Sequence, residues 1–304
     1  MNISIGNKKS YKEILAIILL VLTTILWGTT FIITKTLTQE IPIFLYLGVR
    51  YLFGTIGFIP LFFHFKFINK KIIFLGTTTG FIYFLSMVFQ TYGLQTTTPG
   101  KAGFITGLST VIVPFLAWFI SKKRVNFRIW IAVILSVGGM ALLLLENESG
   151  MIVGDLLVLG CAFFCAFFII FNDRNVQIVD VYLYTILQLI TLAVLCFSSS
   201  LIIGESYNLF SNQLDFWFIM FYMGFGTTSL TFIFQNWSQK YQGPSQTAII
   251  FTLEPVFAAL FGFLLGNYVL TVFNWIGMSL IFGAILIAAI KRNHQKEMEQ
   301  NILE

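Results

Sequence analysis

Long apolar runs separated by short polar breaks make up almost the whole chain. Each run is close to 20 residues long, which is the length at which an α-helix crosses a hydrocarbon core of about 30 Å. Hydrophobic residues are continuous within a run and do not alternate with polar ones, which argues against the strands of a membrane β-barrel. The pattern predicts an all-α integral membrane protein with ten transmembrane helices, over residues 14–37, 42–63, 72–92, 102–121, 127–145, 152–172, 181–203, 215–238, 245–266 and 270–290.

The composition argues against the soluble classes of protein. Of the 304 residues, 57% are hydrophobic and 10% are charged, whereas a soluble domain carries about 25% charged residues. The formal net charge of +5 comes from a few short basic clusters, so no nucleic-acid partner is expected. The lipid bilayer is the expected environment, and ten spans leave no room for a separate soluble domain.

The basic residues indicate which side of the membrane each loop faces. Counted from the N-terminus, the even-numbered loops and both tails hold fifteen of the eighteen Lys and Arg residues. The odd-numbered loops hold Lys101 and several acidic residues. Cytoplasmic loops are enriched in Lys and Arg. The distribution therefore predicts a multi-pass protein of the cytoplasmic membrane with both termini in the cytoplasm.

The two halves of the chain resemble each other at a spacing of 145 residues. Identical residues then align without a gap, among them Gln90 with Gln235, Pro99 with Pro244, Trp130 with Trp275 and Gly138 with Gly283. Five helices per half is an odd number, so the second half would cross the membrane in the opposite sense. We therefore expect two inverted five-helix repeats, residues 1–145 and 146–304, the second ending in a short cytoplasmic tail. Such repeats can open a central site to each side of the membrane in turn.

Five short motifs also point to a family. They are Trp27-Gly28-Thr29-Thr30-Phe31, Val49-Arg50-Tyr51, Pro99-Gly100-Lys101-Ala102, Leu253-Glu254-Pro255-Val256 and Trp275-Ile276-Gly277. In order and spacing the chain resembles the EamA-type transporters of the drug/metabolite transporter superfamily. The resemblance implies a ten-helix inverted-repeat bundle in the bacterial cytoplasmic membrane that moves small organic metabolites, often outward. The sequence departs from the family pattern at Phe164-Cys165, where a tryptophan and a small residue are common.

Two full charges lie near the middle of predicted spans. Arg50 is about eight residues into the second span and Glu254 about nine residues into the ninth. A charge at this depth costs about 2.5–3.5 kcal/mol on insertion scales, so each needs a partner or a watery cavity. In the functional interpretation, Arg50 binds a carboxylate or phosphate of a solute and Glu254 responds to protons or cations. In the structural interpretation, both charges stabilise helix packing, and a direct ion pair between them is left open.

Other candidate substrate-binding residues are polar or aromatic side chains inside the spans. Gln90 and Gln235 are equivalent under the repeat, and their amides would either line a solute path or bridge helices. Trp27, Tyr83 and Trp118 are candidate aromatic walls, and Thr30 belongs to the same motif as Trp27. Core or lipid-facing packing is the competing interpretation for each aromatic residue, since the chain contains 35 Phe.

Two prolines are candidate hinges. Pro255 and Pro114 each remove an N–H from a helix. They serve either as hinges near a site or as static bends.

No catalytic constellation, nucleotide-binding motif, cofactor site or metal site is found in the sequence. Cys161 and Cys165 lie four residues apart, but only His64 and His294 could assist them in binding a metal. The predicted function is therefore a secondary transporter of small organic metabolites, with protons as the candidate coupling ion. The alternatives are a facilitative channel-like permease and a membrane-embedded lipid enzyme, which would need a cluster of acids, bases or metal ligands.

Overall fold

The computed structural model describes residues 3–59, 68–121, 125–144, 153–209, 213–265 and 270–289. In these ranges all regular structure is helical and no strand occurs. The two histidines, the C-terminal tail and several of the basic loop residues lie outside the described residues. The helices are α1 (Ile3–Gly28), α2 (Thr30–Leu37), α3 (Ile43–Ile56), α4 (Lys70–Leu94), α5 (Pro99–Gly107), α6 (Ser109–Ser121), α7 (Phe127–Leu144), α8 (Val153–Asn175), α9 (Val181–Ile203), α10 (Leu214–Phe221), the π-helix η3 (Tyr222–Leu230), α11 (Thr231–Ser238), α12 (Pro244–Phe251), α13 (Leu253–Leu265) and α14 (Val272–Ala289).

Local sequence explains where several helices begin and end. Asn69 and Asp180 cap α4 and α9, because their side chains accept hydrogen bonds from backbone N–H groups in the first turn. Thr98 caps α5 in the same way, and Pro99 follows it at the first helical position. Gly204 ends α9 with a φ of 76°, a left-handed conformation that glycine adopts without strain.

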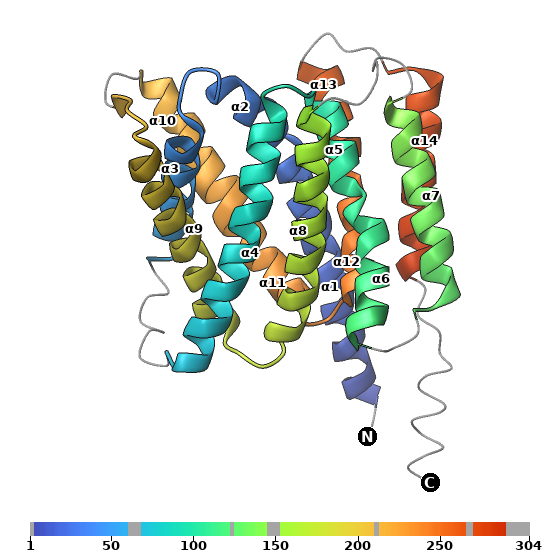
Figure 1. Ribbon diagram of the computed structural model, residues 1–304. Helices are drawn as coiled ribbons and strands as arrows, with labels where there is room; N and C mark the ends of the chain where they lie inside the picture. Colours follow the sequence, from blue (N-terminus) through green and yellow to red (C-terminus); the bar gives the residue numbers. More distant parts are fainter. Residues whose placement is uncertain are drawn as a thin grey trace.

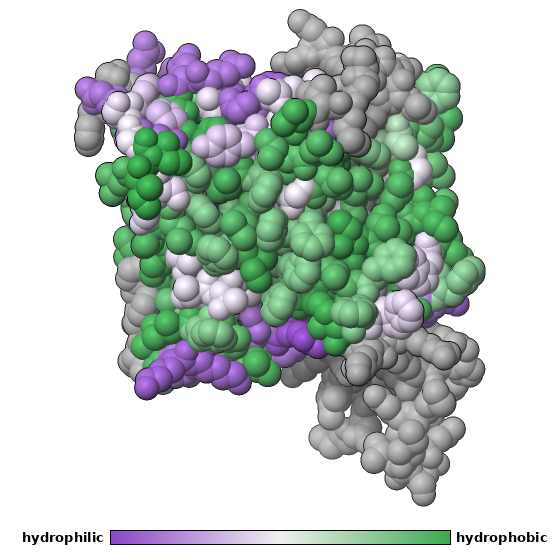
Figure 2. All heavy atoms as spheres, in the orientation of Figure 1, coloured by the Kyte–Doolittle hydropathy of each residue, from purple (hydrophilic) through white to green (hydrophobic). Residues whose placement is uncertain are grey.

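Many helices of the bundle are long and apolar enough to span a membrane. Seven helical stretches are long and apolar enough to cross a membrane, and three more apolar helices are shorter, at Ile43–Ile56, Phe127–Leu143 and Val272–Ala288. A broad hydrophobic band covers the middle of the face shown in Figure 2, with hydrophilic residues along the upper left and lower edges. The chain is therefore an all-helical, multi-pass membrane protein.

Several stretches expected as single continuous helices are interrupted. The breaks fall at Thr29 between α1 and α2, at Leu108 between α5 and α6, and at Thr252 between α12 and α13. The stretch 214–238 contains a π-helix. Thr228 and Ser229 each donate a side-chain hydrogen bond to the carbonyl five residues earlier. Such hydroxyls compete with the backbone ladder, which accounts for the wider turn.

Helix bounds recur at the 145-residue spacing in the two halves. The shift carries Phe127–Leu144 of α7 onto Val272–Ala289 of α14, and Pro99 at the start of α5 onto Pro244 at the start of α12. In Figure 1, α5 leads downward into α6, whereas α12 leads upward into α13. Helices α7 and α14 pack at one edge of the bundle, where a Cβ on Gly277 would lie 2.5 Å from the carbonyl oxygen of Gly139. Only glycine permits this approach of two backbones.

Candidate functional site

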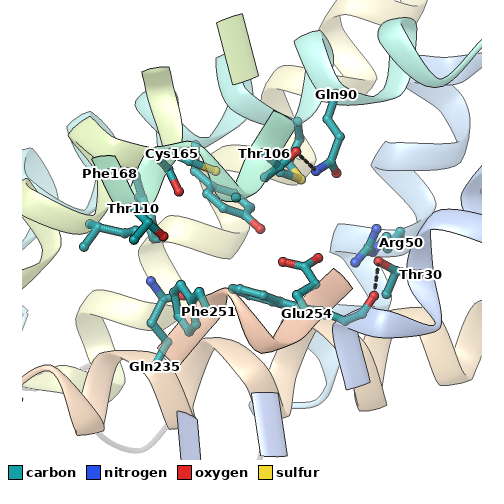
Figure 3. A pocket seen from close by; sticks show the side chains of 16 residues that line it. Thr30, Arg50, Gln90, Thr106, Thr110, Cys165, Phe168, Gln235, Phe251 and Glu254 are labelled. Carbon is teal, nitrogen blue, oxygen red and sulfur yellow. Dashed lines mark hydrogen bonds between the residues drawn. The ribbon is translucent and has the colours of Figure 1, made fainter. Parts of the chain in front are cut away.

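A cavity lies at the centre of the bundle, among helices of both halves (Figure 3). It is lined by Trp27, Thr30, Arg50, Tyr83, Met87, Gln90, Thr106, Gly107, Ser109, Thr110, Cys165, Phe168, Ile169, Gln235, Phe251 and Glu254. About 50 Å³ is available to the centres of water molecules, and each water needs about 10–15 Å³ of such space. The cavity therefore has room for a few waters, and a larger solute requires its walls to move apart.

The helix breaks converge on this cavity. Trp27 and Thr30 flank the break at Thr29, Gly107 and Ser109 flank the one at Leu108, and Phe251 and Glu254 flank the one at Thr252. Irregular backbone at membrane depth is tolerated where it is buried in protein or lines a cavity. Broken helices at a central site are also a recurring feature of secondary transporters.

Arg50 is held by side chains of the π-helix. It is 7% exposed. Its Nε donates to Thr228 Oγ1 at 3.1 Å, and its Nη2 donates to Thr227 Oγ1 at 3.3 Å. Both hydroxyls donate in turn to the carbonyl oxygen of Met223 at 2.8 Å. The guanidinium also lies 5.9 Å from the centre of the Tyr51 ring. The protein therefore supplies acceptors and an aromatic ring for this buried cation.

Glu254 is in a different situation. It is in the first turn of α13, where the positive end of the helix dipole favours a carboxylate. Its carboxylate points into the cavity in Figure 3. Among the described residues, none donates a hydrogen bond to this carboxylate and no ion pair joins it to Arg50. The structure thus places the two charges at one cavity without a direct pair between them.

The two equivalent glutamines both line the cavity, one from each half. Gln90 on α4 donates from Nε2 to Thr106 Oγ1 at 3.4 Å. Gln235 on α11 is 1% exposed, and its Oε1 accepts no hydrogen bond from the described residues. The two amides therefore differ: Gln90 bridges two helices, whereas Gln235 keeps an acceptor that is buried without a donor.

Three of the aromatic and hydroxyl candidates also line the cavity. The indole of Trp27 donates from Nε1 to the carbonyl oxygen of Thr227 at 3.3 Å, and its ring centre lies 5.0 Å from that of Phe251. The Tyr83 ring lies 4.7 Å from that of Phe168. Thr30 donates from Oγ1 to the carbonyl oxygen of Trp27 at 2.9 Å. These bonds orient one aromatic wall at the break between α1 and α2.

Trp118 is the candidate that the structure does not bring to the cavity. It lies on α6, is 54% exposed, and forms a separate surface groove with Phe115, Val125 and Trp130. The side chain lies on the outer face of α6 with those of Phe115 and Phe119, whereas Leu116, Ala117 and Ile120 pack against the core. The sequence expectation grouped Trp118 with the other aromatics only because of residue type.

Several cavity residues were not singled out from the sequence. Cys165 and Phe168 come from α8, Phe251 from α12, and Thr106 and Thr110 from α5 and α6. The Phe164-Cys165 departure from the family pattern includes Cys165 and lies close to Phe168 in the sequence. No feature of the sequence distinguished Phe168 or Phe251 from the other phenylalanines. Packing of distant segments selects them.

Contacts of different chemistry join the helices above and below the cavity, and they are named the upper and lower closure contacts. Above it, in the orientation of Figure 1, Lys101 Nζ of α5 lies 2.7 Å from Asp155 Oδ2 of α8. Thr97 Oγ1 donates to Asp155 Oδ1 at 2.6 Å, and Lys35 Nζ donates to the Thr97 carbonyl oxygen at 2.6 Å. The upper closure contacts are thus ionic and lie near helix ends.

The lower closure contacts are made by neutral amides. Asn172, Gln188, Asn236 and Gln239 are each at most 1% exposed. Gln188 Nε2 donates to Asn172 Oδ1 at 3.0 Å, and Asn236 Nδ2 donates to Gln188 Oε1 at 2.8 Å. Asn172 Nδ2 donates to Asn236 Oδ1 at 2.7 Å and also to Gln239 Oε1. These bonds join α8, α9 and α11, as interhelical amides do in membranes.

The chain is similar to known proteins over most of its length. The model of the EamA-like transporter family matches residues 14–145 and again residues 152–290. An uncharacterized transporter of Archaeoglobus fulgidus is 27% identical over 286 residues, covering 94% of this chain and 89% of the relative. The uncharacterized transporter YoaV of Bacillus subtilis is 23% identical over 275 residues, covering 87% and 91%. A protein of known crystal structure matches with a TM-score of 0.75 at 17% identity, covering 90% and 95%, and it shares the fold.

Proposed function

Because the chain belongs to the EamA-like transporter family, we propose that it is a secondary transporter that moves small organic metabolites across the cytoplasmic membrane. The observation that carries this proposal is the central cavity, where broken helices from both halves bring Arg50 and Glu254 together. A membrane transporter needs such a site between its halves. The family resemblance favours export as the direction.

The proposed mechanism is alternating access by two inverted repeats, residues 1–145 and 146–304, in a bundle of ten spans. Three observations support it. The family model matches twice, the helix bounds recur at the 145-residue spacing, and α5–α6 runs opposite to α12–α13 in Figure 1.

The proposed orientation puts the lower side of Figure 1 in the cytoplasm. On that side α4 and α7 begin with Lys70 and Arg128 in their first turns, and α8 ends with Arg174 in its last turn. Lys240 lies in the connection between α11 and α12. Both termini would then be cytoplasmic, as the positive-inside rule favours. A reporter fused to the C-terminus and tested for accessibility in intact cells checks the orientation, and an external signal contradicts it.

We propose that the solute contacts Trp27, Thr30, Arg50, Tyr83, Gln90, Gln235 and Glu254, which line the cavity. Arg50 gives N–H groups to two threonines, and a guanidinium has five, so it retains donors for a carboxylate. Glu254 is the proposed proton-exchanging group. Trp118 is left out because it lies in a different groove.

Counterflow in proteoliposomes tests the proposal. The purified protein is first screened for thermal stabilisation by amino acids, nucleosides and sugar derivatives, and each stabilising compound is then assayed for transport. A carrier gives saturable uptake that is accelerated by the same compound on the other side. A channel-like permease gives flux without saturation or counterflow. Absence of counterflow for every stabilising compound contradicts the carrier mechanism.

A further inference from the structure

Another groove lies on the outside of the bundle, along the junction of α4 and α9. It has a volume of about 580 Å³ and shares no lining residue with the central cavity. Ile73, Phe74 and Phe81 line it from α4, and Thr191 and Leu195 line it from α9. Phe74 and Phe81 are 68% and 47% exposed. The groove is therefore a mostly apolar surface feature that is separate from the proposed solute site.

Close contact between α4 and α9 gives the groove a fixed shape. A Cβ on Gly76 would lie 2.7 Å from the Cβ of Leu187, and one on Gly80 would lie 2.9 Å from the Cβ of Thr191. Small residues permit such close packing of membrane helices. Since Thr191 also lines the groove, the two helices are held against each other at the level of the groove itself.

Hydroxyl groups in the groove make their hydrogen bonds within their own helices. Thr78 Oγ1 donates to the carbonyl oxygen of Phe74, and Thr191 Oγ1 donates to that of Leu187, both at 2.7 Å. Both threonines line the groove. These two hydroxyl protons are therefore not available to an occupant, and the walls suit an apolar chain.

The groove has the length of one lipid leaflet. Its lining residues on α4 run from Lys70, the first residue of the helix, to Phe81. The eleven steps between them, at about 1.5 Å each, span about 16 Å, and half of a hydrocarbon core of about 30 Å is about 15 Å. Helix α4 begins at the lower side of the bundle in Figure 1. An acyl chain of the lower leaflet can therefore lie along the whole groove.

The lower end of the groove carries positive charge. Lys70 lines it, and Lys70 and the adjacent Lys71 are both exposed. Neither lysine forms an ion pair with an acidic side chain among the described residues. Lys and Arg at the membrane surface are attracted to anionic lipids. An apolar groove of leaflet length with a cation at its surface end thus matches an anionic phospholipid.

We propose that the α4–α9 groove binds one anionic phospholipid, with the phosphate at Lys70 and an acyl chain along Phe74, Thr77 and Phe81. This inference goes beyond the proposed function and does not depend on it. A second copy of the chain fits the same face less well. A two-fold dimer uses the same patch on both subunits, so its interface would hold Lys70 of each copy at the same depth, where like charges repel.

Native mass spectrometry of the purified full-length protein tests the headgroup. The protein is freed of lipid and given equal amounts of phosphatidylglycerol and phosphatidylcholine with identical acyl chains. One phosphatidylglycerol should be retained about fivefold or more in preference, the effect of one lysine near an anionic lipid. Equal retention of the two lipids overturns the proposal.

Substitutions of the cation locate the phosphate. Lys70→Gln should lower the preference for phosphatidylglycerol about fivefold, and Lys70→Arg should keep it. The matched control is Arg128→Gln, an exposed basic residue in the first turn of α7 on the same side of the bundle, which should leave the preference unchanged. An equal loss in Lys70→Gln and Arg128→Gln would assign the preference to net charge and overturn the site.

A bulky side chain in the groove tests the position of the acyl chain. Thr77→Trp should lower the retention of phosphatidylglycerol several-fold, because the indole fills the groove. Ile134→Trp is the matched control, since each position is exposed and is the eighth residue of a helix that begins at the lower side. The Tm of each lipid-free variant shows that it is folded. Unchanged retention in Thr77→Trp places the lipid elsewhere and overturns the proposal.

Two further results distinguish the lipid from other occupants. Millimolar sn-glycerol 3-phosphate should not displace the bound phosphatidylglycerol, because it lacks the acyl chain, and displacement would show a site for a free anion instead. The same spectra report the oligomeric state. A lipid-free dimer that Thr77→Trp dissociates and Ile134→Trp does not would assign the groove to a second copy of the chain. Either result overturns the proposal.

Discussion

Arg50 and Glu254 are two charges at one cavity, and the protein treats them differently. Arg50 has two threonine partners and an adjacent tyrosine ring. Glu254 has no hydrogen-bond donor among the described residues. A buried charge with protein partners stabilises a particular packing, whereas one without partners is costly unless something else neutralises it. The difference places Arg50 in part in the scaffold and supports the proposal that Glu254 exchanges a proton or contacts the solute.

The largest expected effect comes from removing the charge that has no partners. Glu254→Gln should abolish the dependence of transport on a proton gradient, because Glu254 is the proposed proton-exchanging group. Its Tm without ligand should stay within a few degrees of the wild-type value, since no protein contact is lost. Counterflow assays and thermal unfolding on the same preparation check both statements. A large fall in Tm with normal transport would reverse the comparison.

The pH response should depend on the same residue. Counterflow of a stabilising solute should change with pH in the wild-type protein, because protonation removes the charge of Glu254 from the cavity. Counterflow measured at about pH 5 to 8, with the same pH on both sides of the membrane, tests this. The same pH dependence in Glu254→Gln would show that another group is responsible.

Removing the partnered charge should affect stability as well as transport. Arg50→Ala loses hydrogen bonds from a charged group to Thr227 and Thr228, and we expect a destabilisation of about 1–3 kcal/mol. Anionic and zwitterionic solutes should lose transport before neutral ones. Arg128→Ala, at an exposed position, is the matched control. Equal loss for all solutes would assign Arg50 to the scaffold alone.

The ion pair between Lys101 and Asp155, above the cavity, is a further case of a charge that has a protein partner. Asp155→Asn removes the ionic contact with Lys101 but keeps an acceptor for Thr97. We expect faster alkylation of Cys165 by a membrane-impermeant thiol reagent added from the upper side, by a few-fold. The effect should shrink in wild-type protein at high salt, because screening already weakens a pair near the surface. No change in the alkylation rate would mean that the ion pair does not limit opening.

The smallest effect is expected from an aromatic residue outside the cavity. Trp118 is exposed and lines a separate groove, so Trp118→Ala should leave affinity and counterflow within about twofold and stability within about 0.5 kcal/mol. Trp27→Ala, in the cavity wall, is the contrasting variant and should weaken solute binding. A strong transport defect in Trp118→Ala would return this residue to the site.

The class of protein and much of its local structure follow from the order of residues alone. Runs of about 20 apolar residues, capping residues such as Asn69 and Asp180, and prolines at Pro99 and Pro244 act within one or two helical turns, so they can be read without knowing the fold. The charge pattern and the 145-residue spacing are also properties of the linear chain. The family membership predicted from the motifs is confirmed, while ten inverted spans and the cytoplasmic termini stay predictions.

Which side chains share the cavity depends on how the helices pack in the folded bundle. Arg50 meets Thr227 and Thr228 across 177 and 178 residues, and a π-helix that no periodicity indicated positions those hydroxyls. Phe168 and Phe251 line the cavity and Trp118 lies outside it, although all three are aromatic residues in apolar helices. Such contacts depend on how separate helices rotate and break against one another. The free energy that selects them comes from packing between segments, which the order of residues within a single helix does not contain.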